Sequence, residues 1–231
     1  MRHGRPWGRR ERPAAAGQVS RTVPGPGLRA GSDQLIPPGF YLEEDLGEDR
    51  EVAPWPGEAD LVGPVWARNR FQAVLARECA RLGPARLGHE PVPLPRLPQG
   101  GPAWPAGIVG SLTHCAGYRA AIVGRTSAGR SAGIDAEPRR PLPPGVMELI
   151  SSAGEQGLVG RLRVAAPHIH WDTLLFCAKE AVYKAWFPLA RTWVPMTQAA
   201  VWLGTEGSFR VAIRLRENQP GDLTLLSWKG Q

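Results

Sequence analysis

The sequence predicts an α+β fold made of two related halves. Residues 66–82 and 172–187 carry apolar side chains at helical spacing, and each of these segments is followed by short stretches with the alternation of β-strands. The expected strands are residues 108–114, 118–123, 131–137, 201–203 and 209–215, with 223–228 as a candidate for the last. Helix followed by strands, twice over, favours this fold class. The chain has no clear internal repeat, so the relation between the halves depends on this order alone.

The first predicted helix, residues 66–82, has an apolar face and a basic face. The apolar face comprises Ala67, Phe71, Val74, Leu75, Cys79 and Leu82. Arg70, Arg77 and Arg81 share a second stripe, because steps of 7 and 11 residues return to nearly the same angle around a helix. Such a stripe is ordinarily a solvated face. We expect Gly83-Pro84 to end this helix.

The segments on either side of this helix are expected to be irregular. Residues 35–61 place acidic side chains between prolines and are expected to form a loop. Residues 91–107 are rich in Pro and Gly, which predicts an extended or turning segment.

The second predicted helix starts after Asp172, its expected N-cap, and ends at Phe187 before Pro188. Its apolar face comprises Leu174, Leu175, Ala178, Val182, Ala185 and Trp186. Its polar stripe comprises Thr173, Cys177, Glu180 and Lys184. Upstream of it, residues 147–162 are weakly helical.

The positive charge of the chain is concentrated at one end. The formal net charge is +7, but residues 1–30 hold seven arginines and one glutamate, which leaves 21 basic and 20 acidic residues in the remainder. The near-neutral body argues against a large nucleic-acid footprint. We expect residues 1–34 to be a disordered tail rich in Arg, Pro and Gly, because they cannot bury enough apolar surface to fold.

The remaining chain is long enough for two small halves, which we assign to residues 35–132 and 133–231. No run of 18 apolar residues predicts a membrane span, and the Arg-rich start lacks the apolar stretch of a secretory signal peptide. The three cysteines, Cys79, Cys115 and Cys177, show no metal-ligand spacing. A reduced, cytoplasmic setting is therefore expected.

Three carboxylates and one ammonium group are expected to meet if the strand at 131–137 packs on the second helix. Asp135 and Glu137 lie two apart on the strand and point to the same face, while Glu180 and Lys184 lie four apart on the helix. Either pair alone would ordinarily be a surface feature. Together they suit Mg²⁺ bound to a polyphosphate, because Mg²⁺ takes a few carboxylate oxygens and leaves its other positions for water and phosphate.

His114 and Cys115 do not form a thiol catalytic pair, because adjacent strand residues point to opposite faces. His114 has either a phosphate-binding role or a structural one. The sequence contains no glycine-rich phosphate loop of the P-loop or dinucleotide type.

Four blocks, in this order and spacing, resemble the 4′-phosphopantetheinyl transferases of the Sfp/EntD type. The blocks are Trp104-Pro105, Gly110–Cys115, Gly133–Glu137 and Phe176–Trp186. The resemblance covers roughly Trp66 to Trp193 and is closest to the high-GC bacterial branch that modifies carrier proteins of fatty-acid, polyketide and siderophore synthesis. It implies two similar α+β halves related by a pseudo-two-fold axis, with the active site at their interface.

The resemblance also implies roles for individual residues. Asp135, Glu137 and Glu180 would hold Mg²⁺, and Lys184 would contact the phosphates of coenzyme A and assist the leaving group. Glu180, directly or through a metal-bound water, is the best candidate to take the proton of the acceptor serine.

A second set of residues is implied at the nucleotide of coenzyme A. Thr113 and His114 would lie there, with His114, Arg96 and Arg77 near the 3′-phosphate. A further arginine is expected about eight residues before Arg77, where this chain has Asn69, so that Arg70 or Arg68 would substitute.

The implied reaction is Mg²⁺-dependent transfer of 4′-phosphopantetheine from coenzyme A to a serine of an apo acyl or peptidyl carrier protein, as in the holo-[acyl-carrier-protein] synthase type. The other product is adenosine 3′,5′-bisphosphate. A monomer with no nucleic-acid or membrane partner is expected. Family members continue with another strand pair, whereas this sequence ends at Trp228–Gln231, so the second sheet is expected to lack that pair.

Two other functions stay open from the sequence. A metal-dependent nuclease would also use carboxylates and a lysine, but its glutamate and lysine normally lie two apart on one strand. A truncated relative would hold coenzyme A or a carrier protein without catalysing transfer.

Overall fold

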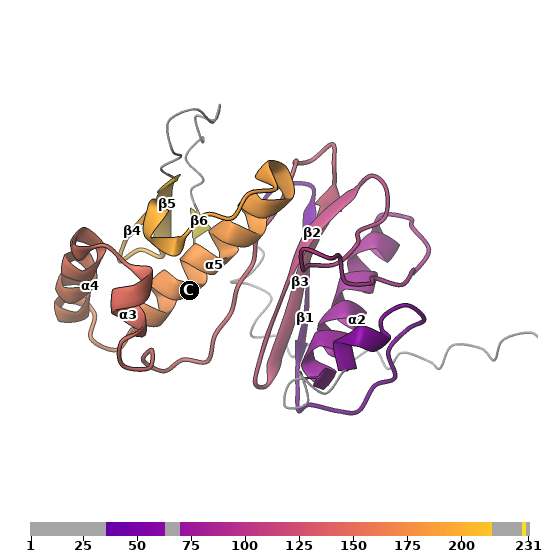
Figure 1. The fold of residues 1–231 in the computed structure, drawn as a ribbon, viewed down its shortest axis with the longest axis horizontal. Coiled ribbons are helices and arrows are strands. Elements are labelled where there is room, and N and C mark those ends of the chain that lie inside the picture. Colours follow the sequence, from indigo (N-terminus) through magenta and orange to yellow (C-terminus); the bar gives the residue numbers. More distant parts are fainter. Residues whose placement is uncertain (1–35, 63–69, 214–227, 230–231) are drawn as a thin grey trace, which may run out of the picture.

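The computed structural model describes residues 36–62, 70–213 and 228–229, which form two groups of helices and strands (Figure 1). Both groups combine helices with antiparallel strands, which confirms the predicted mixture of helix and sheet. The tail predicted for residues 1–34 lies outside the described residues.

The first group packs one long helix against a three-stranded antiparallel sheet. The strands β1 (Phe40–Leu46), β2 (Ile108–Cys115) and β3 (Tyr118–Arg125) have the spatial order β1-β3-β2. The helix α2 (Arg70–Arg86) packs on this sheet and contacts the short 3-10 helix η2 (Ala59–Val62). The buried cluster between helix and sheet comprises Cys79, Ala80, Leu94, Ile108, Ala121 and Val123. The predicted β2–β3 hairpin is confirmed.

The sequence-based prediction for residues 35–61 is wrong, because these residues include β1 and η2 rather than loop alone. The acidic residues of β1 gave this strand the composition of an exposed loop. Glu43 is 7 % exposed and forms an ion pair with Arg86, so its charge is neutralised by α2, a partner that the local sequence does not reveal.

The predicted end of the first helix is also wrong, since α2 runs through Pro84 to Arg86. Gly83 is a packing residue rather than a terminator, because a Cβ built there would lie 2.7 Å from the Cβ of Val123 in β3. The faces differ as well: Leu82 is 45 % exposed, whereas Arg77 and Arg81 are buried. The predicted start at residue 66 lies outside the described residues.

The second group packs three helices on another antiparallel sheet. The helices are α3 (Val146–Ile150), α4 (Ala153–Ala165) and α5 (Trp171–Ala190), followed by the 3-10 helix η4 (Met196–Gln198). The strands β4 (Ala199–Leu203), β5 (Ser208–Ile213) and β6 (Trp228–Lys229) lie in that order. The buried cluster joins α4 and α5 to β4 and β5 through residues that include Val159, Leu162, Trp171, Leu175, Val201 and Phe209.

The helix boundaries of the second group differ from the prediction. The weakly helical stretch splits at Ser151-Ser152, where Ser152 and Glu155 form a capping box that starts α4. His170, not Asp172, is the N-cap of α5, and Pro188 lies inside that helix. α5 ends at Ala190 because Arg191 adopts the left-handed conformation, with φ 54°.

The segment 131–137, which we call the carboxylate segment, is extended but pairs with no strand of the described chain through backbone hydrogen bonds. The predicted strand is therefore wrong in its pairing. Figure 1 shows the chain leaving β3 and passing between the β1-β3-β2 sheet and α5, with α2 on the far side of that sheet.

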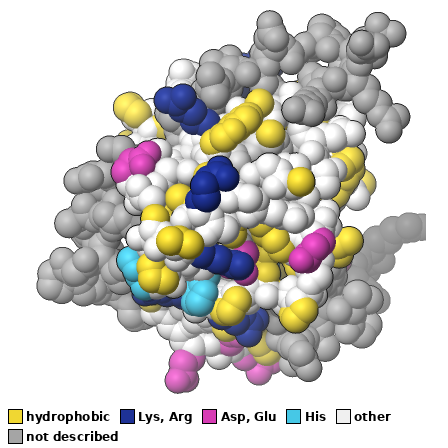
Figure 2. Space-filling view, turned by 90° about the vertical axis from the view of Figure 1, so that its left-hand side faces the viewer, with side chains coloured by type: hydrophobic (Ala, Val, Ile, Leu, Met, Phe, Trp, Pro, Cys, Tyr) yellow, Lys and Arg dark blue, Asp and Glu magenta, His cyan; other side chains and the backbone are white. Residues whose placement is uncertain are grey.

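The face that carries α3 and α4 has no single dominant charge. Basic side chains lie there among acidic and hydrophobic ones (Figure 2). No helix in the described part of the chain is long and apolar enough to cross a membrane.

Candidate active site

The carboxylate segment is bound to β2 by side-chain hydroxyls. The backbone N–H of Ile134 donates to Ser111 Oγ at 3.2 Å, and that of Ala136 donates to Thr113 Oγ1 at 2.9 Å. Both hydroxyls come from the same face of β2, because the residues lie two apart. Thr113 Oγ1 also donates to Asp135 Oδ1 at 3.4 Å, so these two candidate site residues lie side by side.

Gly133 allows the carboxylate segment to lie directly against α5. A Cβ built at Gly133 would stand 1.9 Å from the carbonyl oxygen of Ala181, in the middle of the helix. No real Cβ tolerates such a contact with backbone, so a side chain at position 133 would push the segment off the helix.

Lys184 joins α5 to both β2 and the carboxylate segment. Its Nζ donates to Asp135 Oδ1 at 2.6 Å, to the carbonyl of Ile134 at 3.1 Å and to the carbonyl of Leu112 at 3.2 Å. The Asp135 side chain is 8 % exposed and that of Lys184 27 %. The convergence of helix and segment, on which the sequence argument depended, is therefore present.

The three predicted metal ligands influence one another electrostatically. Burial and the charge of Asp135 raise the pKa of Glu180, and Glu137 adds to this while Lys184 opposes it. Burial and the charge of Asp135 likewise raise the pKa of Glu137. Negative charge therefore exceeds what Lys184 neutralises, which is the condition that a bound cation would relieve.

These acids fit a divalent cation chemically, although they are not arranged as a finished site. Asp135 Oδ2 is buried and has no hydrogen-bond partner among the described residues, so one carboxylate oxygen remains for a further ligand. In the part of the chain that the structure describes, no group of three or more acidic, histidine or cysteine side chains stands ready to hold a metal ion. The ligand set Asp135, Glu137 and Glu180 stays a prediction.

A second group of predicted residues carries positive charge beside these acids. Burial and the positive charges of Lys184 and Arg77 lower the pKa of His114, which favours its neutral form. Burial lowers the pKa of Arg77, with Arg81 and Arg96 adding to this while Glu58 and Asp60 oppose it. The charges of Arg77, Arg96 and His114 thus belong to one neighbourhood. The Arg70 side chain is not among those that the structure describes.

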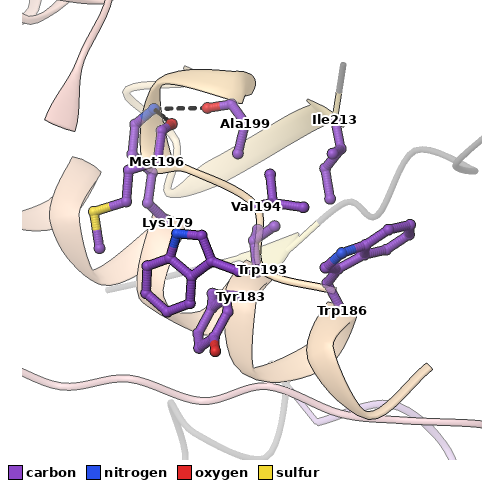
Figure 3. Close-up of a pocket in the computed structure, with 9 residues that line it drawn as sticks. Lys179, Tyr183, Trp186, Trp193, Val194, Met196, Ala199 and Ile213 are labelled. Atoms are coloured by element: carbon purple, nitrogen blue, oxygen red, sulfur yellow. Dashed lines mark hydrogen bonds between the residues drawn. The ribbon is translucent and has the colours of Figure 1, made fainter. Parts of the chain in front are cut away.

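An aromatic cleft that was not predicted from the sequence lies next to Glu180. Tyr183, Trp186 and Trp193 line it, and the Tyr183 and Trp193 ring centroids are 4.4 Å apart (Figure 3). Burial and the charge of Glu180 raise the pKa of Tyr183, which links the cleft to the acids. Tyr183 and Trp186 flank Lys184 in sequence, and their aromatic character next to a polar stripe was the available signal.

Lys179 fixes the wall of this cleft. Its Nζ donates to the carbonyls of Met196 at 2.8 Å and Ala199 at 2.6 Å (Figure 3). It also pairs with Glu155 at 2.7 Å. Lys179 directly precedes Glu180, so the residue that supports the cleft and the Glu180 carboxylate lie on the same turn of α5.

The cysteines near the site are poor nucleophiles. Burial and the charges of Glu137 and Asp135 raise the pKa of Cys115, and burial with the charge of Asp135 raises that of Cys177. A thiol needs its thiolate form to attack, so these shifts agree with the rejection of thiol catalysis.

Two family models match this chain over most of its length. A family model described as the 4′-phosphopantetheinyl transferase N-terminal domain matches residues 67–124. A model of the 4′-phosphopantetheinyl transferase superfamily matches residues 131–229.

Curated relatives agree with these family models. The chain is 38 % identical to the 4′-phosphopantetheinyl transferase Npt of Nocardia iowensis over 208 residues, 86 % of this chain and 92 % of that protein. It is 47 % identical over 157 residues to PptT of Mycobacterium tuberculosis, covering 68 % of each chain. It is 43 % identical over 145 residues to Svp of Streptomyces mobaraensis, 63 % of this chain and 59 % of that one. With family models matching residues 67–124 and 131–229 and a relative covered almost completely, the chain belongs to the 4′-phosphopantetheinyl transferase superfamily.

Proposed function

We propose that this protein transfers 4′-phosphopantetheine from coenzyme A to a serine of an apo acyl or peptidyl carrier protein and releases adenosine 3′,5′-bisphosphate. The observation that carries the proposal is the convergence of Asp135, Glu180 and Lys184 beside a cationic group that includes Arg77 and His114. Relatives that bear the name 4′-phosphopantetheinyl transferase support it. The finer assignments, a holo-[acyl-carrier-protein] synthase type that serves fatty-acid, polyketide or siderophore synthesis as a cytoplasmic monomer, belong to the same proposal.

We further propose that residues 35–132 and 133–231 are two halves related by a pseudo-two-fold axis, with the reaction at their interface. Each half has its own buried cluster, which supports the division. Lys184 of the second half donates to the carbonyl of Leu112 in the first, which supports an interfacial site.

Mg²⁺ is the cation that we assign to Asp135, Glu137 and Glu180. The unpartnered Asp135 Oδ2 and the raised pKa values of both glutamates support this assignment. When bound, the ion would neutralise charge on the pyrophosphate of coenzyme A.

The side chains of this chain would share the remaining work. Glu180 is the base that we assign to the serine hydroxyl, since burial and neighbouring acids raise its pKa and so strengthen it as a proton acceptor. Lys184 is assigned to the phosphates and the leaving group, which requires its ammonium to exchange Asp135 for phosphate oxygen. Thr113 and His114 are assigned to the nucleotide, and Arg77, Arg96 and Arg70 to the 3′-phosphate.

The aromatic cleft suits the pantetheine arm, which combines an apolar chain with two amides. Tyr183 and Trp193 offer apolar surface to such a chain. Trp186 lines the cleft, and its buried Nε1 has no hydrogen-bond partner among the described residues, so we assign an amide carbonyl of the arm to it.

Intact-mass spectrometry tests the proposal. Apo acyl and peptidyl carrier proteins are incubated with the protein, coenzyme A and Mg²⁺, and each carrier that is a substrate gains one phosphopantetheine mass. Glu180→Gln should slow the gain at least about a hundredfold because it removes the base. Glu148→Gln is the matched control, since Glu148 is exposed on α3 and its substitution should leave the rate unchanged.

The result also separates the alternative functions. Unchanged mass of every carrier in the presence of folded protein would overturn the proposal. If calorimetry then detects tight binding of coenzyme A, the protein is a binding module of the same family rather than a transferase.

A further inference from the structure

Arg77 of the cationic group belongs to a buried cluster of charges whose other two members, Glu58 and Arg81, have no role assigned so far. Glu58, just before η2, is 0 % exposed, and Arg77 and Arg81 of α2 are 5 % and 4 % exposed. Burying ionised groups is costly unless each finds partners of opposite charge or strong hydrogen bonds. The partners of these three residues therefore indicate what each residue is for.

Arg81 is completely engaged by the protein itself. Its Nη2 pairs with Glu58 Oε1, its Nη1 pairs with Glu78 at 2.7 Å, and its Nε donates to the carbonyl of Val92 at 3.3 Å. The ring of Trp55 lies 4.2 Å from its guanidinium carbon. Every nitrogen of Arg81 has a protein partner, so this side chain is not available to a ligand.

Arg77 differs from Arg81 because its contacts are neutral. Its Nε donates to the carbonyl of Leu94 at 2.7 Å and its Nη1 to the carbonyl of Ala73 at 3.1 Å. Among the described residues Arg77 forms no salt bridge. A buried guanidinium held by carbonyls, with Arg96 contributing further positive charge nearby, is suited to an incoming anion.

Glu58 connects these two arginines through the loop that follows α2. The Oε1 atom that pairs with Arg81 also accepts the backbone N–H of Leu94 at 2.6 Å. Leu94 is therefore held at both ends, by Glu58 at its N–H and by Arg77 at its carbonyl. Arg96 follows Leu94 by two residues. The hydrogen bonds that hold Leu94 therefore also help to fix the backbone position of Arg96.

We propose that Glu58 is a positioning residue for the 3′-phosphate of coenzyme A. By holding Arg81 and the Leu94 backbone, it keeps Arg81 from competing for the phosphate and aims Arg77 and Arg96 at it. This inference rests on the proposed function. Glu58 itself is completely buried and touches no substrate.

The test compares coenzyme A with 3′-dephospho-coenzyme A, which lacks only the phosphate in question. Glu58→Gln keeps the shape and an oxygen acceptor for Leu94 but removes the charge that holds Arg81. We expect calorimetry to give at least about tenfold weaker binding of coenzyme A, and little change for the dephosphorylated donor. The kcat at saturating coenzyme A should stay within about twofold of wild type, while KM rises.

Glu43→Gln is the matched control. Glu43 is also a buried carboxylate of the first half, 7 % exposed, and it pairs with Arg86 of the same helix rather than with Arg81. We expect this variant to lose stability while both donors bind as in wild type. A double-mutant cycle should show coupling between Glu58 and Arg77 in coenzyme A binding, and none between Glu43 and Arg77.

The outcomes separate this inference from the proposed function. Equal weakening of both donors in Glu58→Gln, or the same donor pattern as in Glu43→Gln, would mean that Glu58 only stabilises the fold. A wild-type protein that transfers phosphopantetheine but does not distinguish the two donors would also overturn the inference, and the proposed function would stand. A wild-type protein that binds and transfers neither would overturn the proposed function itself.

Discussion

Gly133 decides how closely the carboxylates approach α5. Its missing side chain leaves room for the carbonyl of Ala181, which a Cβ would meet at 1.9 Å. Asp135 and Glu137 follow directly, so their positions depend on this contact.

Gly133→Ala is therefore expected to cut the transfer rate on the order of a hundredfold, because a displacement of about 1 Å in a catalytic group has an effect of that size. Intact-mass kinetics with a carrier protein measures the rate. Gly160→Ala is the control, since a Cβ at Gly160 of α4 meets nothing within 4 Å. The control should be stabilised by about 0.5–1 kcal/mol with the rate unchanged. A wild-type rate for Gly133→Ala would contradict the site geometry.

Trp186 has a buried Nε1–H that finds no partner among the described residues. Trp186→Phe removes that donor and retains an aromatic ring. We expect the free protein to lose less than about 1 kcal/mol of unfolding free energy, because the unpaired donor contributes nothing favourable. Coenzyme A binding should weaken about fivefold or more, as one hydrogen bond is lost. Denaturation and calorimetry measure the two effects, and unchanged affinity would remove Trp186 from the site.

The directions of the candidate side chains were predictable where periodicity alone decides them. Glu180 and Lys184 share a helical stripe, and Asp135 faces Lys184, as the spacing indicates. The buried roles of Arg77 and Arg81 were not predictable, because their partners come from Glu58 and from backbone carbonyls of an irregular loop. A stripe of arginines has the same local pattern whether water or a distant carboxylate covers it.

At the scale of elements, helices and hairpins followed their patterns, and the main failures come from partners distant in sequence. Gly83-Pro84 was expected to stop α2, yet the helix continues because these residues pack against β3, and tertiary packing outweighs local propensity. α5 also continues through Pro188, whose side chain is exposed. The carboxylate segment has the alternation of a strand but lies against a helix and side-chain hydroxyls. These partners lie at least 23 residues away in the sequence, so the local pattern of the segment cannot reveal them.

Two hydrogen bonds, which we call the latch, hold the loop before α3 to the start of α5. The backbone N–H of Leu142 donates to Asp172 Oδ2 at 3.0 Å, and Thr173 Oγ1 donates to the carbonyl of Arg140 at 2.5 Å. Asp172 is 4 % exposed and also pairs at 3.1 Å with Arg163, whose side chain is largely exposed. Asp172, which was expected to be the N-cap of α5, therefore binds the loop before α3 to this helix.

This latch predicts a pH dependence of stability. Burial raises the pKa of Asp172, but backbone hydrogen bonds, led by that from Leu142, together with the charge of Arg163 outweigh it and leave the pKa below its usual value. A lowered pKa in the folded state adds stability above the unfolded-state pKa of about 3.9, and this is lost as pH falls through the folded-state value. Asp172→Asn should therefore cost about 1–2 kcal/mol at pH 7.

The difference between wild type and Asp172→Asn should shrink as pH is lowered below about 4, when the wild-type carboxyl becomes protonated as well. Urea denaturation at several pH values measures it. A difference that is the same at neutral and acidic pH would show that the charge of Asp172 is not what holds the latch.

At the scale of the whole molecule, the ammonium group of Lys184 joins the two groups of elements. Lys184 on α5 binds the carbonyl of Leu112 in β2 as well as Ile134 and Asp135 between them. The three acids at this junction share Lys184 as a cation, since it pairs with Asp135 and its charge opposes the raised pKa of both Glu137 and Glu180.

Lys184→Met should consequently lower the free energy of unfolding by about 3 kcal/mol, because it leaves Asp135 buried without its counter-ion. Mg²⁺ should raise the Tm of this variant more than that of wild type, since the ion then supplies the missing positive charge. Calorimetry with NaCl at matched ionic strength is the control for screening. The double variant Lys184→Met with Asp135→Asn should lose the extra response, and an equal response in all three proteins would argue against a cation at these acids.

The hydroxyls of Ser111 and Thr113 hold the amides of Ile134 and Ala136 where a strand would have offered carbonyls. Two such bonds open independently of any ladder, so these two amides should exchange with deuterium faster than those of the neighbouring hairpin. A donor molecule that clamps Asp135 would slow both. Deuterium uptake at the amides of Ile134 and Ala136 therefore reports whether the site is occupied, and the measurement does not require the enzyme to catalyse transfer.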